Sequence, residues 1–307
     1  YKTDYTMYSM DFEEFLWAFG DETTVPFLQE CFEKQMPLGQ ALHRKTMNLF
    51  REYMLVGGMP QSVIAYREHK DFSASDRIKR RILKLYRDDV TKFAGRQTSK
   101  VLSIFDGIPS QLSQKEKKYN LSSLGKNARL RAYEDAFIWL REAMVVNTCF
   151  NATEPTVGLN LNTERTTQKC YMADTGLLVT HTFSDDNFSD NDLYRDILLD
   201  KLNVNEGMIA ENIVAQELRS HGHKLFFFSR SDSSERANNM EIDFLLRSKR
   251  KICPVEVKSA SYQYHASLDK FYKKYSDTLG QAYILYTKDI MKKNNILHLP
   301  LYMAMFL

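Results

Sequence analysis

A predicted β-hairpin over residues 240–259 carries side chains that could do chemistry together. Acidic and apolar residues alternate along its first strand, so Asp243 lies on the polar face, and Glu256 and Lys258 lie on the polar face of the second strand. A turn midway along the hairpin places Asp243 opposite Glu256, and Glu241 opposite Lys258. Facing carboxylates repel each other, so the pair is expected either to be open to water or to share a cation.

A helix predicted over residues 206–220 supplies a further carboxylate. Glu211 shares one face of this helix with apolar residues, and a carboxylate on an apolar stripe is uncommon unless it has a partner. A hard divalent cation such as Mg²⁺ takes oxygen ligands and neutralises charge that develops on a phosphodiester. The alternative interpretation of the same residues is a polar strand face that is solvated or paired in salt bridges.

The order of these elements resembles the PD-(D/E)XK nuclease fold: a helix with Glu, a hairpin with Asp, Glu-x-Lys on the next strand, then a helix and a strand. The resemblance implies that Asp243 and Glu256 bind Mg²⁺, that Lys258 positions the attacking water, and that Glu211 is an auxiliary catalytic ligand. The Pro that gives the motif its name is absent before Asp243. An inactive nuclease-like fold is the alternative that this resemblance leaves open.

Nearly the whole chain resembles a second, larger group. Six segments occur in the same order as in that group: residues 10–18, 57–60, 86–89, 133–136, 171–178 and 241–244. Together they look like the C-terminal portion of bacterial and archaeal AAA-type ATP-binding proteins, in which a domain of unknown function follows the ATPase. The resemblance implies an upstream ATPase domain, missing from this sequence, that would be the only site for ATP.

Positive charge is concentrated in one window of the chain. Residues 77–131 contain 15 Lys and Arg but 4 Asp and Glu, a net charge of +11, whereas the whole chain carries +3. Such a window is the electrostatic footprint expected of a protein that binds the phosphate backbone of DNA. The alternative is the solvated face of a basic helix over residues 77–87.

The middle of the chain has the order of a winged helix. Helices are predicted over residues 99–112, 121–127 and 129–144, and two strands over 145–150 and 168–172. Lys126, Arg129 and Arg131 gather at the start of the third helix, where a recognition helix presents donors to DNA. Winged helices also bind proteins, so a protein-interaction module is the alternative.

The sequence predicts an α+β multidomain protein. The expected parts are a helical segment (1–78) that connects to the missing ATPase core, a winged-helix domain (79–183), an acidic linker (184–200) and an α/β, restriction-endonuclease-like domain (201–307). Hydrophobic residues make up 43%, and no apolar run is long enough to span a membrane. Four scattered cysteines suit a reducing cytoplasm.

Further elements are expected from periodicity and from turn signals. They are helices over residues 11–19, 42–56 and 267–275, a helix from Pro60 onward, a helix–turn–helix corner at Gly57-Gly58, and strands over 225–229 and 281–287. The expected function is a DNA-associated fragment of an ATPase-family protein, with Mg-dependent phosphodiester cleavage by its C-terminal domain. The alternative is a non-catalytic, protein-binding adaptor; the sequence does not fix the oligomeric state.

Overall fold

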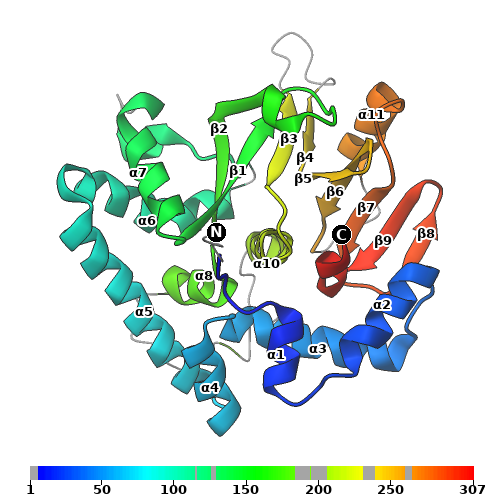
Figure 1. Cartoon of the computed structure of the whole chain (residues 1–307), viewed down its shortest axis with the longest axis horizontal. Coiled ribbons are helices and arrows are strands. Elements are labelled where there is room, and N and C mark those ends of the chain that lie inside the picture. Colours follow the sequence, from blue (N-terminus) through cyan, green and yellow to red (C-terminus); the bar gives the residue numbers. More distant parts are fainter. Residues whose placement is uncertain are drawn as a thin grey trace, which may run out of the picture.

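The structure, a computed structural model, describes residues 6–114, 116–125, 129–183, 194, 206–230, 239–259 and 265–307. Lys126 and the predicted acidic linker, apart from Tyr194, lie outside the described residues. The fold is α+β, as the sequence predicts, with helices in the N-terminal half and two mixed sheets in the C-terminal half (Figure 1). Within the described ranges, no helix is long and apolar enough to cross a membrane.

The first part of the chain folds into helices. They are α1 (Phe12–Ala18), α2 (Thr24–Lys34), α3 (Gln40–Val56), α4 (Pro60–His69), α5 (Phe72–Phe93), α6 (Thr98–Ser113) and α7 (Leu130–Glu142). Asp11 and Glu14 form a capping box at the start of α1, because each side chain accepts a hydrogen bond from the amide of the other residue. Of the helix expected over 121–127, the described residues form a 3-10 turn, Leu121–Leu124.

The corner between α3 and α4 requires both of its glycines. Gly57 has a φ of +80°, and a Cβ on Gly58 would lie 2.1 Å from the carbonyl oxygen of Met10. The amide of Gly58 donates to Oδ2 of Asp174 at 2.6 Å, and Oδ1 of Asp174 caps α8 (Thr175–Thr182) by accepting from the amide of Leu177 at 2.8 Å. One buried carboxylate therefore joins the corner to α8.

The second part of the chain supplies the sheets. Its elements are β1 (Val146–Ala152), β2 (Thr163–Met172), α8, α10 (Glu206–Ser220), β3 (Phe226–Arg230), β4 (Met240–Ile242), β5 (Phe244–Ser248), β6 (Lys251–Val257), α11 (Ala266–Tyr275), β7 (Ala282–Tyr286), β8 (Met291–Lys293) and β9 (Ile296–Pro300). The strand orders are β2-β1-β3-β4 and β5-β6-β7-β9-β8. The predicted wing, β1 with β2, is antiparallel, and β1 also pairs in parallel with β3, so the wing belongs to a larger sheet.

The hairpin of β5 and β6 has the predicted register, because Phe244 pairs with Val255 and Ser248 pairs with Lys251. The first strand is not continuous, however: it breaks at Asp243, and residues 240–242 form β4, which pairs with β3. Glu241 therefore lies opposite Ser229, and the expectation that it faces Lys258 is wrong. The break turns the side chain of Asp243 toward the backbone of β6, where Oδ2 accepts from the amide of Val257 at 2.9 Å.

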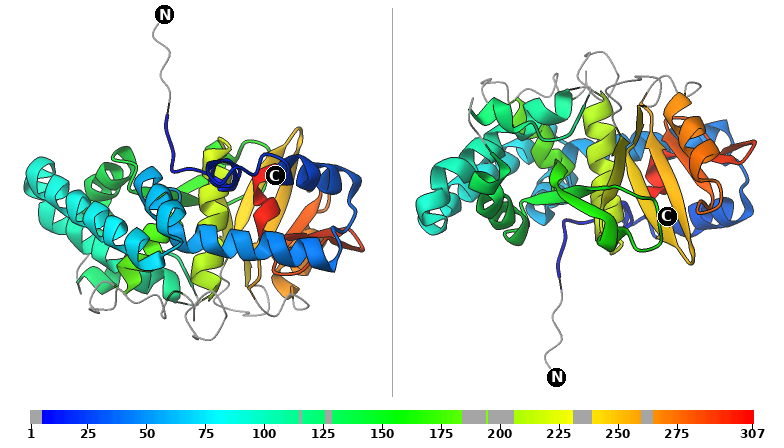
Figure 2. Two further views of the ribbon diagram at one scale, coloured as in Figure 1. Left: turned by 90° about the horizontal axis from the view of Figure 1, so that it is seen from below. Right: turned by 90° about the horizontal axis from the view of Figure 1, so that it is seen from above.

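Helix α10 lies at the centre of the molecule, between the helical part and the sheets (Figures 1 and 2). Every residue from Met208 to Leu218 is buried, so this helix has no solvated face along its middle. The larger hydrophobic cluster runs from Phe12 in α1 to Met305 in the final 3-10 turn, Leu301–Phe306. Both halves of the chain therefore pack into a shared core around α10.

Candidate functional site

Four carboxylates meet beside α10, and three lysines lie among them. The carboxylates are those of Glu211 in α10, Glu241 in β4, Asp243 between β4 and β5, and Glu256 in β6. The lysines are Lys117, Lys169 in β2, and Lys258. We call these seven residues the carboxylate–lysine cluster. Of the residues predicted for catalysis, the structure thus brings Glu211, Asp243, Glu256 and Lys258 to this cluster.

Lys169 lies inside the cluster. Its ammonium nitrogen is 3.2 Å from Oε1 of Glu241, 3.4 Å from Oδ1 of Asp243 and 3.6 Å from Oε2 of Glu211. The Lys169 side chain is 1% exposed. Burial alone would lower the pKa of Lys169, but the three carboxylates outweigh it and raise that pKa well above its usual value. Lys169 is therefore held as a buried cation.

Glu211 has a full set of partners. Lys117 forms a close ion pair with Oε1 and also donates to the carbonyl oxygen of Gly207 at 3.2 Å, while the hydroxyl of Tyr171 donates to Oε2 at 2.9 Å. Burial opposes ionisation of Glu211, but Lys169 and Lys117 outweigh that effect and lower its pKa below the usual value. Glu211 on the apolar face of α10 thus has the partners that the sequence predicts, and they are Lys117 and Lys169.

Asp243 and Glu256 lie where β5 and β6 leave their shared ladder. Glu256 is 4% exposed and pairs with Lys258 at 2.9 Å. Burial and the nearby Asp243 together raise the pKa of Glu256 to about 7, even though Lys258 acts in the opposite direction. Burial also raises the pKa of Asp243, as does the charge of Glu211. Asp243 therefore acts on Glu256, and Glu211 acts on Asp243, each as a nearby like charge.

The donor set does not fit the Mg²⁺ that the resemblance implies. Among the described residues, no three or more His, Cys, Asp or Glu side chains are grouped in a way that could hold a metal ion. Carboxylates that would be its ligands already surround the ammonium of Lys169. A further cation beside Lys169 would meet a like charge at short range.

Sequence reasoning misses Lys117, Lys169 and Tyr171. A signal for two of them is present, since Lys169 and Tyr171 are two apart and so share one face of the strand-like run 168–172. A lysine and a tyrosine on one face of a strand call for a nearby anion when that face is buried. Lys117 follows the end of α6 and shows no comparable pattern.

The basic window is partly neutralised within the fold. Lys79 is fully buried, where its ammonium donates to the carbonyl oxygen of Leu55, and Lys117 belongs to the carboxylate–lysine cluster. Arg80 pairs with Asp76, and Arg87 pairs with Asp106. The charge of +11 therefore overstates how much positive charge the window offers to a partner.

The three residues proposed to read DNA are only partly described. Arg129 is the residue before α7 and Arg131 is in its first turn, and both are exposed. Lys126 lies outside the described residues. The two arginines stand at the start of the helix, as the sequence predicts.

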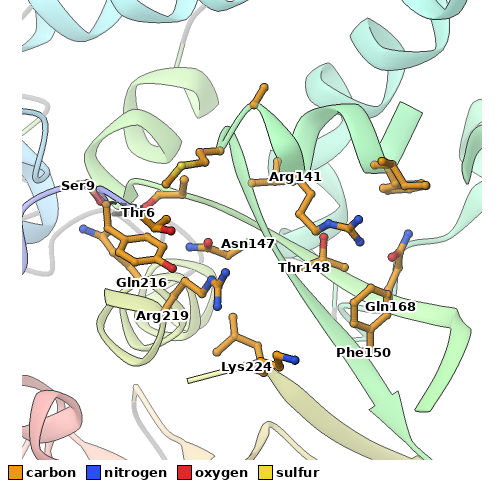
Figure 3. A pocket seen from close by; sticks show the side chains of 18 of the residues that line it. Thr6, Ser9, Arg141, Asn147, Thr148, Phe150, Gln168, Gln216, Arg219 and Lys224 are labelled. Carbon is orange, nitrogen blue, oxygen red and sulfur yellow. Dashed lines mark hydrogen bonds between the residues drawn. The ribbon is translucent and has the colours of Figure 1, made fainter. Parts of the chain in front are cut away.

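A second feature, which the sequence does not predict, is a basic pocket of about 720 Å³ (Figure 3). It lies between α7, the β1–β2 hairpin, the end of α10 and the start of β3. Four of its lining residues are cations and one, Glu134, is an acid. The cations are Arg141, Arg165, Arg219 and Lys224. All four lie outside the basic window.

Polar and aromatic side chains complete the basic pocket. Asn147 is 9% exposed and Gln168 is 6% exposed, and both line the cavity (Figure 3). Within the part of the chain that the structure describes, neither side-chain amide has a hydrogen-bond partner. Phe150 and Phe226, which are paired across β1 and β3, also line it. Neither amide belongs to the buried side-chain atoms that lack a partner, so both reach the solvent of the cavity, which a polar ligand could fill.

Comparisons with known proteins divide the chain into two segments. Residues 47–187 match the family model of a domain of unknown function, DUF8612, and residues 206–302 match that of another, DUF4143. DUF4143 is a domain often found C-terminal to AAA ATPase domains. No curated protein and no solved structure matches the chain significantly. Lys117 and Lys169 come from the first segment and the four carboxylates from the second, so the cluster is built across both.

Proposed function

We propose that this chain binds single-stranded nucleic acid in the basic pocket. The observation that carries the proposal is that four cations and the side-chain amides of Asn147 and Gln168 line one cavity. Arginine and lysine bind phosphate, and an amide presents both a donor and an acceptor to the edge of a base. Phe150 and Phe226 add aromatic faces, and stacking on aromatic rings is the usual way in which proteins hold unpaired bases.

The size of the pocket favours a single strand over a duplex. Its volume of about 720 Å³ falls in the range of small-ligand pockets. A duplex would instead need a long open surface, with an element that enters one of its grooves. An unpaired segment can place a base in the cavity while its phosphates meet the cations around it.

Binding of a fluorescein-labelled oligothymidylate, followed by fluorescence anisotropy, tests this proposal. The informative variant is Arg165→Ala with Lys224→Ala, because both side chains line the pocket, are exposed, and have no ion pair within the described residues. The matched control is Arg250→Ala with Lys273→Ala, which removes the same charge from exposed positions outside the pocket.

We expect the pocket variant to bind more weakly than the control. Its affinity should also depend less on salt, with a slope of log K against log salt reduced by about 1.4 for two lost contacts to a single strand. Equal affinities for the two variants would refute the pocket as the site. A thymidine mononucleotide that competes as well as the oligomer would mean that the pocket binds nucleotides rather than strands.

Contact with duplex DNA by Lys126, Arg129 and Arg131 is a second proposal, supported by the exposure of the two arginines at the start of α7. Replacing Arg129 and Arg131 with Ala should weaken binding to a labelled duplex and leave binding to the single strand unchanged. The variant with both replacements should keep the fold, because the two arginine side chains are exposed. An unchanged affinity for the duplex would favour the alternative of a protein-binding adaptor.

The match to DUF4143 supports a further proposal, that the chain acts beside an AAA ATPase domain, which would be the site for ATP. The four cysteines are buried and free, which supports the proposal of a reducing, cytoplasmic location. The proposal of a neighbouring ATPase domain is tested by asking whether this chain co-purifies with an active ATPase. We do not propose Mg-dependent cleavage, because the carboxylate–lysine cluster does not fit Mg²⁺.

A further inference from the structure

The carboxylate–lysine cluster has an internal cation at its centre. Lys169 is within 3.6 Å of three carboxylate oxygens, which come from α10, from β4 and from the break between β4 and β5. Several carboxylates that converge on one point normally require a cation there. Here a side chain supplies it, from a strand of the first segment.

We propose that the ammonium of Lys169 takes the place of a divalent metal ion in this cluster, so that the native protein holds these carboxylates together without metal. This inference is independent of nucleic-acid binding in the basic pocket. It concerns a different set of residues, and either proposal can fail alone.

The charges of the cluster agree with this assignment. Four carboxylates and three ammonium groups leave one formal negative charge, which is too little to attract a divalent ion into a buried site. Without Lys169, the same four carboxylates would face two ammonium groups, one of which pairs with Glu211 and the other with Glu256. Glu241 and Asp243 would then have no ammonium within 4 Å among the described residues.

The backbone keeps Lys169 in this place. It pairs with Cys149 in the ladder of β1 and β2, and with Lys118 in an isolated bridge on its other side. The side chain is 1% exposed, and its ammonium also lies 5.2 Å from the centre of the Phe227 ring. It therefore cannot leave for solvent unless the sheet opens, and it is a permanent part of the site.

Binding of Mn²⁺, followed by electron paramagnetic resonance of the free ion, tests the assignment directly. The wild-type chain should bind no Mn²⁺ more tightly than about 1 mM, the weak end of protein sites for hard divalent cations. Lys169→Met keeps the length of the side chain but removes its charge, and it should bind one Mn²⁺ at least about tenfold more tightly. Mn²⁺ should also raise the melting temperature of this variant and not that of the wild type.

Two further variants separate charge from position. Lys117→Met removes an ammonium that contacts only Glu211 among the four carboxylates, so it should behave as the wild type. Adding Asp243→Asn to Lys169→Met should abolish the gain in Mn²⁺ binding. Tight Mn²⁺ binding by the wild type would overturn the proposal, and so would a folded Lys169→Met chain that gains none. If Lys169→Met does not fold, Lys169→Gln replaces it in the comparison with the wild type. Tight Mn²⁺ binding in the titration of the wild-type chain would still overturn the proposal.

Discussion

Glu217 in α10 tests how burial of a carboxylate changes its pKa and the stability of this fold. Its side chain is fully buried: Oε1 accepts from the amide of Phe12 at 3.2 Å, while Oε2 has no hydrogen-bond partner among the described residues. Burial, together with the charge of Asp11, raises the pKa of Glu217 from 4.5 to about 8. The folded chain therefore keeps a proton that the unfolded chain releases near pH 4.5.

The sign of the pH dependence follows from this difference. Below pH 4.5 both states are protonated and Glu217 costs nothing, whereas between pH 4.5 and 8 each pH unit lowers the free energy of unfolding by about 1.4 kcal/mol. Glu217→Gln keeps an acceptor for Phe12 and cannot ionise. We therefore expect this variant to gain on the order of 3–4 kcal/mol over the wild type between pH 5 and pH 8.

Urea unfolding followed by circular dichroism at pH 5 and pH 8 measures this gain. Glu154→Gln is the matched control, because it makes the same substitution at an exposed position. A difference between Glu217→Gln and the wild type that is the same at both pH values would refute the reasoning. It would mean that Glu217 is already ionised in the folded chain at pH 5.

Two other substitutions test the corner between α3 and α4. Gly58→Ala would bring its Cβ within 2.1 Å of the carbonyl oxygen of Met10. We therefore expect the free energy of unfolding, measured with urea, to fall by at least about 3 kcal/mol. A loss below about 1 kcal/mol would contradict the geometry. Asp174→Ala removes the acceptor for the amides of Gly58 and Leu177 and should cost about 2–4 kcal/mol, again by urea unfolding. Asp174→Asn, which keeps one acceptor oxygen, should cost less, and equal costs for Ala and Asn would argue against the cap.

Local patterns predict much of this fold. The bounds of α10 are those predicted from its periodicity, and the register of β5 with β6 follows from the turn between them. Two of the missed elements have weak local signals. In helix α8 the large apolar residues are the consecutive Leu177, Leu178 and Val179, so the helix shows no amphipathic face, and β8 is exposed throughout, so it shows no alternation.

The candidate site is predictable only in part, for a physical reason. Glu211, Asp243, Glu256 and Lys258 belong to one segment, and local alternation marks their faces. Lys169 is separated from Asp243 by 74 residues, and only the folded chain brings the two together. The break of the strand at Asp243 is also set by tertiary structure, because β4 pairs with β3 rather than with β6. Charge patterns along a sequence cannot show which anion a distant lysine will meet.

The parallel pairing of β1 with β3 has a consequence for how the polypeptide can be divided. Phe150 pairs with Phe226 across the boundary between the two matched families, so a cut between residues 183 and 206 would separate neighbouring strands of one sheet. Each piece alone would present an unpaired strand edge, which promotes aggregation. Expressed together, the two pieces should reassemble as a split protein, and the pairing of Lys169 with the carboxylates would return only in that complex.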